Sequence, residues 1–340
     1  MSEITFSDVM FEPQYSEIRS RSKVDLSTQL GKTKLTIPLI SSNMKDITGV
    51  KMVAEMARYG CLGILHRFMS IEENVEAFFQ AIVDARSACG VLDGDFSPYV
   101  GVSVGVKKEE RDRFLSLYKA GAKLFCVDVA HGHSVLVKEM IAYMRDNSED
   151  IYIIAGNIAT AKAAEDLCAW GASAVKTGVG PGGVCITRKM TGVGVPQLHA
   201  LMEVRSADMD VDIISDGGIN TPGDVAKALK YADAVMIGSL FSGTTETPGQ
   251  VYKNVDGQFY KTYGGSASGE NKVKGGNGNN FVEGVVKTVP FKGHVKYIIR
   301  EIADGLRSSF SYSGSSNLKE FQQRAILRQI SSGARIESKF

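Results

Sequence analysis

One glycine-rich loop of this chain places a thiol, a hydroxyl and a fixed cation close together in the sequence. Cys185, Thr187 and Arg188 follow the segment Gly178-Val-Gly-Pro-Gly-Gly183. Glycine lets backbone N–H groups approach an anion closely. Arg188 and the loop amides would favour the thiolate of Cys185, which adds to electron-poor carbon. The loop therefore predicts covalent catalysis on an anionic substrate, and the alternative is a flexible turn with a buried cysteine.

Two further glycine turns follow the next two apolar runs of the chain, at Asp216-Gly217-Gly218 and at Gly238-Ser239. Together with Gly182-Gly183 they predict a phosphate site built from backbone N–H groups. Asp216 would repel a phosphate, but its carboxylate is suited to accept hydrogen bonds from a ribose diol. Phosphate beside ribose predicts a nucleoside monophosphate with its base facing Cys185, whereas a plain tight turn is the alternative for Asp-Gly-Gly.

Short apolar runs recur along the chain, and most are rich in β-branched residues, as in strands that are covered on both faces. Amphipathic stretches of helical length separate most of them, such as Thr160–Gly171 and Thr221–Tyr231. This alternation predicts an α/β fold, a (β/α)8 TIM barrel, with a doubly wound open sheet as the alternative. The predicted strands are Ile37–Ser41, Cys61–Leu65, Tyr99–Val104, Leu124–Val129, Ile151–Ala155, Ser173–Thr177, Val211–Ser215 and Ala234–Ile237.

A barrel predicts that reactive side chains gather where the strands end, because its active site lies at the C-terminal face. Polar residues lie at the ends of all eight predicted strands, and three of the five histidines are among them. Taken singly, each histidine is more often a structural hydrogen-bonding group than a catalyst. These polar residues are Asn43, His66, Arg67, Ser103, Asp128, His131, His133, Asn157, Lys176, Asp216 and Ser239.

The composition argues against several classes of function. The 340 residues are 44% hydrophobic and 23% charged, with a formal net charge of +1, so nucleic acid or an anionic membrane is not expected as the main partner. No apolar run reaches the roughly 18 residues of a membrane span, and the first residues lack a signal-peptide pattern. Five cysteines without a CxxC pair indicate reduced thiols, so we expect a cytoplasmic protein.

The segment that follows the eighth predicted strand is polar and rich in glycine over about residues 263–284. It is either a disordered surface loop or a mobile flap that closes over the site and supplies Glu283. Beyond it, Lys292–Leu306 predicts a helix, and Leu318–Arg324 begins another polar stretch. Because no repeat and no linker divides the chain, we expect one barrel domain over residues 1–340.

Several motifs together resemble the IMP dehydrogenase / GMP reductase family, and the resemblance covers essentially the whole chain. The active-site loop Val179–Gly194, followed by Pro196-Gln197, carries most of it. The resemblance implies a (β/α)8 barrel assembled as a homotetramer, in which the cysteine becomes covalently attached to C2 of a purine. The other matching segments are Ser20–Asp25, Cys126–His133, Ile154–Asn157, Ser215–Ile219, Val235–Ser239 and Ser308–Gly314.

The resemblance also implies roles for individual residues. The catalytic residues would be Cys185, Thr187 and Glu283. The nucleotide, GMP or IMP, would contact Gly182, Gly183, Asp216, Gly217, Gly218, Gly238, Ser239, Gly265, Ser266, Ala267 and Gly284. NADPH would contact Asp128, Val129, Ala130, Val179, Gly180, Ser313 and Gly314, together with Ser20 and Arg21 from an adjacent subunit. A monovalent cation such as K+ would be held mostly by backbone carbonyls of Gly180, Gly182, Cys185 and Arg188.

Two features favour the reductase branch of this family. Dehydrogenases hydrolyse the purine adduct with an Arg-Tyr pair on the flap, and this chain has no arginine between Arg205 and Arg300. Dehydrogenases usually also carry a regulatory CBS-type insertion after strand two, and the interval between His66 and Tyr99 leaves no room for one. We therefore predict an oxidoreductase of purine metabolism that converts GMP to IMP and ammonia with NADPH.

Two alternatives remain open at this point. An IMP dehydrogenase without the regulatory insertion would share the reactive Cys185, and a non-catalytic purine-nucleotide-binding barrel would share the fold. Retention of Cys185, Thr187 and Glu283 together argues against the second alternative. Asn279-Asn280 stands where some reductases carry an arginine. This difference is expected to change the flap's contacts with cofactor and phosphate and to leave the chemistry unchanged.

Overall fold

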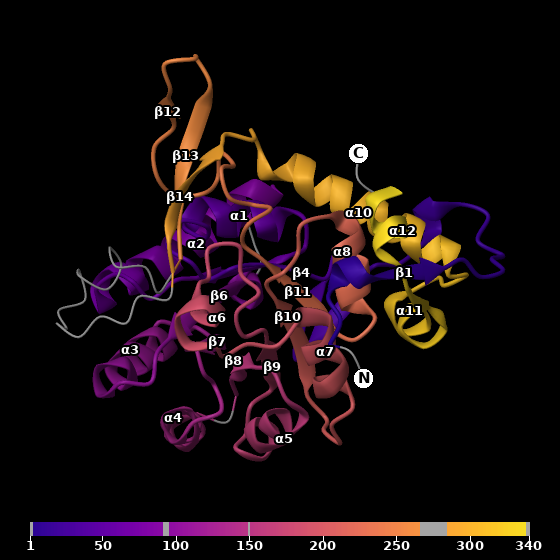
Figure 1. Ribbon diagram of the computed structural model, residues 1–340. Helices are drawn as coiled ribbons and strands as arrows, with labels where there is room; N and C mark the ends of the chain where they lie inside the picture. Colours follow the sequence, from indigo (N-terminus) through magenta and orange to yellow (C-terminus); the bar gives the residue numbers. More distant parts are fainter. Residues whose placement is uncertain (1–2, 91–94, 149, 266–283, 338–340) are drawn as a thin grey trace.

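Eight parallel strands close into a barrel, and helices cover its outside (Figure 1). The computed structural model describes residues 3–90, 95–148, 150–265 and 284–337. Neighbouring barrel strands follow the order β10-β11-β4-β5-β6-β7-β8-β9, so the predicted (β/α)8 TIM barrel is confirmed. These strands are β4 (Leu39–Ser41), β5 (Leu62–Leu65), β6 (Val100–Val104), β7 (Leu124–Asp128), β8 (Tyr152–Ile158), β9 (Ala174–Thr177), β10 (Asp212–Asp216) and β11 (Ala234–Ile237).

Local sequence sets the starts of several of the helices between these strands. At the start of α5 the Thr160 hydroxyl accepts a hydrogen bond from the Ala163 N–H, and Thr221 with Asp224 forms a capping box at α8. The helices are α1 (Val50–Arg58), α2 (Ile71–Cys89), α3 (Lys108–Lys119), α4 (Val135–Asn147), α5 (Ala161–Ala169), α6 (Thr187–Thr191), α7 (Gln197–Arg205) and α8 (Pro222–Leu229). Three short 3-10 helices are η1 (Phe6–Asp8), η2 (Arg21–Lys23) and η3 (Ser97–Tyr99).

A hairpin packs against the apolar interior of the barrel. Strands β2 (Thr28–Leu30) and β3 (Thr33–Leu35) pair antiparallel, and Leu30 and Leu35 are fully buried among side chains that point inward from the barrel strands. The turn between them needs glycine, because Gly31 has φ +53° and a Cβ there would lie 2.4 Å from the ring of Tyr152. The barrel interior is therefore a packed core, and a ligand site is expected at the C-terminal ends of the strands.

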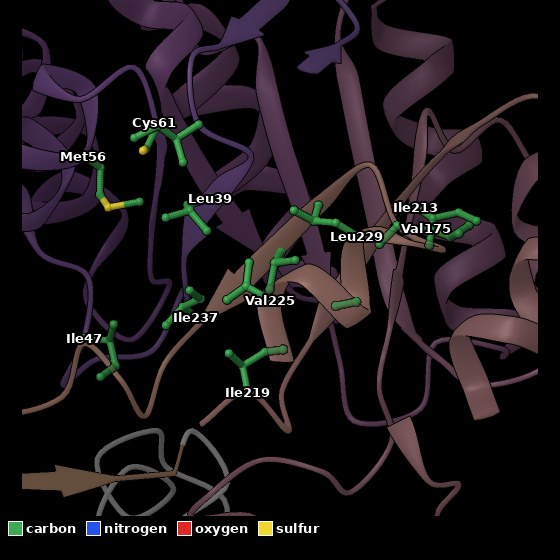
Figure 2. Packing of buried hydrophobic residues seen from close by; sticks show 14 of the residues in the cluster. Leu39, Ile47, Met56, Cys61, Val175, Ile213, Ile219, Val225, Leu229 and Ile237 are labelled. Carbon is green, nitrogen blue, oxygen red and sulfur yellow. The ribbon is translucent and has the colours of Figure 1, made fainter. Parts of the chain in front are cut away.

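A second apolar layer lies between the barrel wall and the surrounding helices. Figure 2 shows Leu39 and Ile237 from adjacent strands near Val225 and Leu229 of α8, with Met56 of α1 on the other side. All five side chains are almost completely buried. Burying side chains of this size stabilises the fold by about 1.5–3 kcal/mol each, which keeps the strand ends in fixed positions.

The remaining elements lie outside the barrel. Strands β12 (Tyr252–Lys253), β13 (Phe259–Gly264) and β14 (Val286–Pro290) form an antiparallel sheet, part of which projects from the barrel in Figure 1. Strand β1 (Val9–Glu12) pairs antiparallel with β15 (Ile326–Gln329). The predicted helix Lys292–Leu306 is observed as α10 (Val295–Tyr312), and the polar stretch after it forms α11 (Leu318–Arg324), followed by α12 (Ser332–Glu337).

Membrane-spanning helices are not found in the described part of the chain. The longest helices, α2 and α10, mix charged residues with apolar ones along their length. No helix there combines the length and the apolar character that crossing a bilayer requires.

Candidate active site

The reactive cysteine lies on the loop between β9 and α6, at the C-terminal end of the barrel strands. Its thiol donates a hydrogen bond to the Thr187 hydroxyl, with 3.2 Å between Sγ and Oγ1. Its backbone N–H donates to the Gly182 carbonyl at 3.0 Å, which closes a tight turn. Cys185 is half-buried, whereas Cys61 and Cys126 are fully buried and burial raises the pKa of both thiols. The structure therefore brings Cys185 and Thr187 together as predicted.

The Arg188 side chain packs within the cysteine loop. Its guanidinium donates to the Val195 carbonyl at 2.5 Å. A Cβ on Gly180 or on Gly194 would lie within 2.6 Å of the Arg188 side chain, so the side chain fills the space between these two glycines. Arg188 closes the loop on itself, and its role in activating the Cys185 thiolate stays a prediction.

Both ends of the predicted flap lie against the cysteine loop. Gly284 and Cys185 form an isolated antiparallel bridge. The Val285 N–H donates to the Val184 carbonyl at 3.0 Å, and the Gly265 N–H donates to the Val285 carbonyl at 3.1 Å. The predicted contacts Ser266, Ala267 and Glu283 lie outside the described residues. The described ends of the segment nevertheless fix its start and its finish beside the thiol.

The glycine turns predicted to hold a phosphate converge on the same loop. A Cβ on Gly183 would lie 2.8 Å from Ser239 Oγ, and a Cβ on Gly217 would lie 3.3 Å from the Gly182 nitrogen. Gly217 and Gly218 have φ of +91° and +79°, a backbone conformation that favours glycine. Gly238 packs against Tyr263, whose hydroxyl would lie 3.2 Å from a Cβ at that position. The turns after β9, β10 and β11 thus form one continuous backbone surface.

Beneath this surface lies a buried lysine that the sequence analysis did not connect with its partners. Lys176 on β9 is 1% exposed, and its Nζ lies 2.8 Å from Asp128 Oδ1 and 2.6 Å from Asp216 Oδ2. Nζ also donates to the Asn157 side-chain carbonyl, and Asn157 Nδ2 donates to Asp216 Oδ2 at 2.9 Å. We call Lys176, Asp128, Asp216 and Asn157 the Lys176 cluster.

The register of the sheet explains how Lys176 reaches across a strand. Asp128 pairs with Gly156 on one side, and Lys176 pairs with Gly156 on the other. A Cβ on Gly156 would lie 2.7 Å from the Lys176 Cβ, so only glycine leaves room for the crossing. A lysine inside the apolar run of Ser173–Thr177 was the available signal, because a buried ammonium needs an acidic partner.

Mutual attraction within the Lys176 cluster shifts the pKa values of Lys176 and Asp128. Burial alone would lower the pKa of Lys176, but the charges of Asp128 and Asp216 outweigh it and raise that pKa. Burial alone would raise the pKa of Asp128, but Lys176, Arg67 and a hydrogen bond from Asn43 hold it below its usual value. The carboxylates of Asp128 and Asp216 both keep a partly exposed edge at the mouth of the barrel.

The histidines predicted at the strand ends take different roles. His66 is buried, its Nδ1 accepts the Phe68 N–H, and burial together with Lys45 and Arg113 lowers its pKa to about 4. His133 points toward α5, where Nε2 lies 2.8 Å from Asp166. His131 is exposed in the loop that follows β7. No described contact joins any of them to Cys185, so the structure gives them no catalytic position.

The residues predicted to contact the dinucleotide fall into two groups. Asp128–Ala130 lie beside Val179-Gly180, because Asn157 bonds both the Val129 carbonyl and the Gly178 carbonyl. The second group is distant in sequence: Arg21 donates to Ser308 and to the Tyr312 hydroxyl, next to Ser313-Gly314. In the described part of the chain, no hydrogen bond connects this second group with the cysteine loop. Such a separation is what a contribution to a neighbouring subunit would require.

The cation ligands that the resemblance implies all belong to the cysteine loop and to α6. Gly180 and Arg188 are in contact, and the Gly182 carbonyl already accepts the Cys185 N–H. Each carbonyl oxygen has a second lone pair, so these hydrogen bonds leave room for a weakly bound cation. Among the described residues no cluster of histidine, cysteine and carboxylate side chains could hold a metal ion.

Comparison with known sequences places these features in a family. The family model of the IMP dehydrogenase / GMP reductase domain matches residues 3–340. An inosine-5′-monophosphate dehydrogenase of Nitrosopumilus maritimus is 32% identical, covering 98% of this chain and 97% of the relative. A GMP reductase of Streptococcus equi is 37% identical, covering 94% of this chain and 92% of the relative.

A solved structure is similar over the whole chain. A cysteine-to-alanine variant of a GMP reductase from Trypanosoma brucei, in complex with guanosine 5′-monophosphate, superposes with a TM-score of 0.91 at 30% identity. The match covers 100% of this chain and 98% of that one. A GMP reductase of Leishmania donovani, 32% identical over 98% of this chain and 96% of the relative, aligns over 472 residues. That length exceeds the 340 residues of this chain, so a reductase also carries inserted segments and insertions alone do not separate the two activities.

Proposed function

The chain belongs to the IMP dehydrogenase / GMP reductase family, and on this basis we propose that it is a GMP reductase. The reaction is the NADPH-dependent reductive deamination of GMP to IMP and ammonia, a step of purine nucleotide interconversion. The observation that carries the proposal is the pairing of Cys185 with Gly284 at the end of the flap. Gly284 lies in the stretch between Arg205 and Arg300, which contains no arginine.

This pairing bears on the choice between the two activities. Hydrolysis of a purine–cysteine adduct requires a base that activates water, and the family's dehydrogenases use a flap Arg-Tyr pair for it. Deamination requires a proton donor for the leaving amine. Thr187 lies 3.2 Å from the Cys185 thiol, and Glu283 is the covalent neighbour of Gly284. The residues available here suit deamination better than hydrolysis.

The proposed chemistry assigns a step to each residue. The Cys185 sulfur adds to C2 of the purine, and a ring nitrogen takes up a proton as the S–C2 bond forms. The C2–N bond to the exocyclic amine then breaks, with Glu283 and Thr187 delivering the proton that lets ammonia leave. NADPH supplies the hydride that C2 receives. Breaking of the S–C2 bond returns the thiolate of Cys185 and releases IMP.

Holding the substrate and cofactor falls to the rest of the site. The turns at Gly182-Gly183, Gly217-Gly218 and Gly238-Ser239 would bind the phosphate, and Asp216 would accept the ribose hydroxyls. Asp128–Ala130 and Val179-Gly180 would hold the nicotinamide half of NADPH. Ser20, Arg21, Ser313 and Gly314 would serve a neighbouring subunit of a homotetramer. Carbonyls of Gly180, Gly182, Cys185 and Arg188 would hold K+.

The first test measures both possible reactions on the same protein. We expect oxidation of NADPH with GMP, with release of ammonia and IMP in equal amounts, and little or no reduction of NAD with IMP. Loss of a positioned base costs on the order of 10²–10⁴ in rate, which would make the dehydrogenase reaction negligible. Robust NADH formation from IMP would assign the chain to the dehydrogenase activity.

The second test concerns the thiol. Cys185→Ala should abolish turnover and leave GMP binding within roughly 1–2 kcal/mol of the parent, because phosphate and ribose contacts lie elsewhere. Cys168→Ala is the matched control, since Cys168 is also a half-buried free thiol but lies on α5. GMP should protect Cys185 and not Cys168 against alkylation. Substantial activity in Cys185→Ala would disprove the covalent mechanism.

A further inference from the structure

Two lysines lie beside the turns that are proposed to hold the substrate phosphate. Lys287 Nζ on β14 donates to the Gly183 carbonyl at 3.1 Å. Lys292 Nζ donates to the carbonyls of Ser239 and Leu240 at 3.2 and 3.0 Å. Neither lysine belongs to the glycine turns themselves, and both come from the segment that follows the flap. The phosphate surface is therefore bordered by two ammonium groups.

The sheet fixes where the Lys287 side chain starts. Lys287 pairs with Tyr263 in the antiparallel register of β13 and β14, and its Nζ lies 5.8 Å from the centre of the Tyr263 ring. Tyr263 in turn packs against Gly238. Lys287 itself is exposed, and an ammonium has three protons to donate. Its bond with the Gly183 carbonyl therefore leaves it able to contact a ligand.

Gly183 leaves an open space between a hydroxyl and this ammonium. A Cβ at Gly183 would lie 2.8 Å from Ser239 Oγ and 3.9 Å from Lys287 Nζ. Any side chain at position 183 would therefore crowd Ser239 and occupy the space between the two groups. With glycine there, the Ser239 hydroxyl and the Lys287 ammonium border one space, and both are donors that phosphate oxygens accept.

Lys292 adds to the positive charge in this region. Lys292 Nζ contacts the backbone of the same turn whose Ser239 hydroxyl borders the space at Gly183, so a second ammonium lies at this turn. Burial, and then the charge of Lys287, lower the pKa of Lys292. Lys292 is committed to the Ser239 and Leu240 carbonyls, so it positions that turn. A dianionic ligand beside Lys287 would relieve the repulsion between the two lysines.

We propose that Lys287 binds the phosphate of the nucleoside monophosphate, as a charged side-chain contact added to the backbone turns. The proposal rests on the proposed function only in taking a nucleoside monophosphate as the substrate. Because GMP and IMP carry the same phosphate, it does not depend on which of the two is turned over.

The test compares Lys287→Met with Lys253→Met by calorimetric titration. Lys253 is an exposed lysine of the same small sheet whose Nζ lies over the Phe259 ring, so its replacement removes the same charge away from the site. We expect Lys287→Met to weaken GMP and IMP equally, by about 10- to 100-fold, since charge-assisted hydrogen bonds to phosphate are strong. Guanosine, which lacks the phosphate, should bind both variants and the parent alike.

Two further measurements keep the proposal falsifiable. Inorganic phosphate should bind the parent and Lys253→Met more tightly than Lys287→Met. In the unaltered protein, GMP but not guanosine should protect Lys287 against acetylation, as read by mass spectrometry, which gives an answer even if Lys287→Met does not fold. Unchanged GMP affinity in Lys287→Met, or an equal loss for guanosine, would overturn the proposal. NAD reduction with IMP would overturn only the proposed function.

Discussion

Two polar clusters of this molecule are each built around one buried cation, and they use it differently. Lys176 lies 2.6–2.8 Å from two aspartates at the C-terminal ends of the barrel strands. Arg113 of α3 lies 3.3 Å from Glu110 and reaches across to α2. The two cations are 2% and 9% exposed in their side chains, so burial of the cation does not distinguish the clusters.

The acidic partners make the difference. Glu110 is only 9% exposed and accepts the Gly105 N–H at 2.7 Å, while Arg113 also donates to two backbone carbonyls and to Asn74. Asp128 and Asp216 remain 21% and 19% exposed although they share one ammonium. A cluster whose carboxylate is buried among protein donors holds helices together, whereas one whose carboxylates keep an open edge can receive a ligand.

The largest effect is expected for Lys176→Met. It would leave two carboxylates facing each other without their ammonium, which typically costs about 3–5 kcal/mol of stability. Displacement of Asp128 and Asp216 should also lower kcat/KM on the order of 100-fold. Lys261→Met is the control, because Lys261 is 2% exposed and donates only to the Thr244 and Thr247 carbonyls among its described contacts. If the two variants lose equal activity per folded molecule, Lys176 has only a structural role.

Arg113→Met should show the opposite division of effects. Removing the guanidinium takes the nearest cation from buried Glu110 and the donor from two backbone carbonyls, so the free energy of unfolding should fall by about 3–5 kcal/mol. Because no described contact links Arg113 to the cysteine loop, kcat and KM should stay within about twofold. Denaturant titration and steady-state kinetics on the same preparation separate the loss of stability from any loss of activity. A large fall in kcat at full folding would contradict the distinction drawn between the clusters.

The pKa of His66 tests whether the charge of Arg113 acts on a group outside its own cluster. Because burial, Lys45 and Arg113 lower its pKa from 6.5 to about 4, the unfolded chain binds the proton more readily. Stability should therefore be full above pH 6.5 and fall by up to about 3 kcal/mol as the pH drops from 6.5 to 4. His66→Gln should flatten this window, and Arg113→Met should raise the pKa of His66. Unfolding curves at several pH values measure this dependence. The same pH dependence of stability in the parent and in His66→Gln would contradict the prediction.

The smallest effect is expected for Asp216→Asn. The amide keeps the shape of the side chain but loses the charge that accepts ribose hydroxyls, so GMP should bind about 10-fold more weakly. The 2′,3′-dideoxy analogue of GMP lacks the diol, and its affinity should be the same in parent and variant. If the analogue loses as much affinity as GMP, Asp216 only shapes the turn and the Lys176 cluster.

The fold could be predicted from the sequence because local residue patterns mark the strands and helices of the barrel. Strands covered on both faces appear as continuous apolar runs, and all eight of them are observed, with β8 extending from its predicted end at Ala155 to Ile158. The placement of polar residues after the strands follows from the same pattern. The contact of Cys185 with Thr187 is also local, since only two residues separate them.

Contacts that depend on how neighbouring strands pair could not be predicted from the sequence. Lys176 meets Asp128 only because Gly156 stands between them in register, and nothing in either segment alone indicates that pairing. Arg188 was expected beside the thiol from its sequence distance, but its direction is set by the space above Gly180 and Gly194. The role of Lys287 likewise arises from the pairing of β14 with β13.

The pairing of β1 with β15 has a consequence for how the chain is made. Val9 lies opposite Gln329, and further ion pairs join Asp8 to Arg335 and Glu12 to Arg328. During synthesis β1 cannot pair with β15 until residue 329 has been made, although the entropy of closing so long a loop grows only slowly with its length. The barrel strands can pair with near neighbours in the meantime. Arg21 and Ser308 of α10 meet across an interval of 287 residues. The surface proposed to serve a neighbouring subunit would therefore also be completed late, and assembly would follow folding.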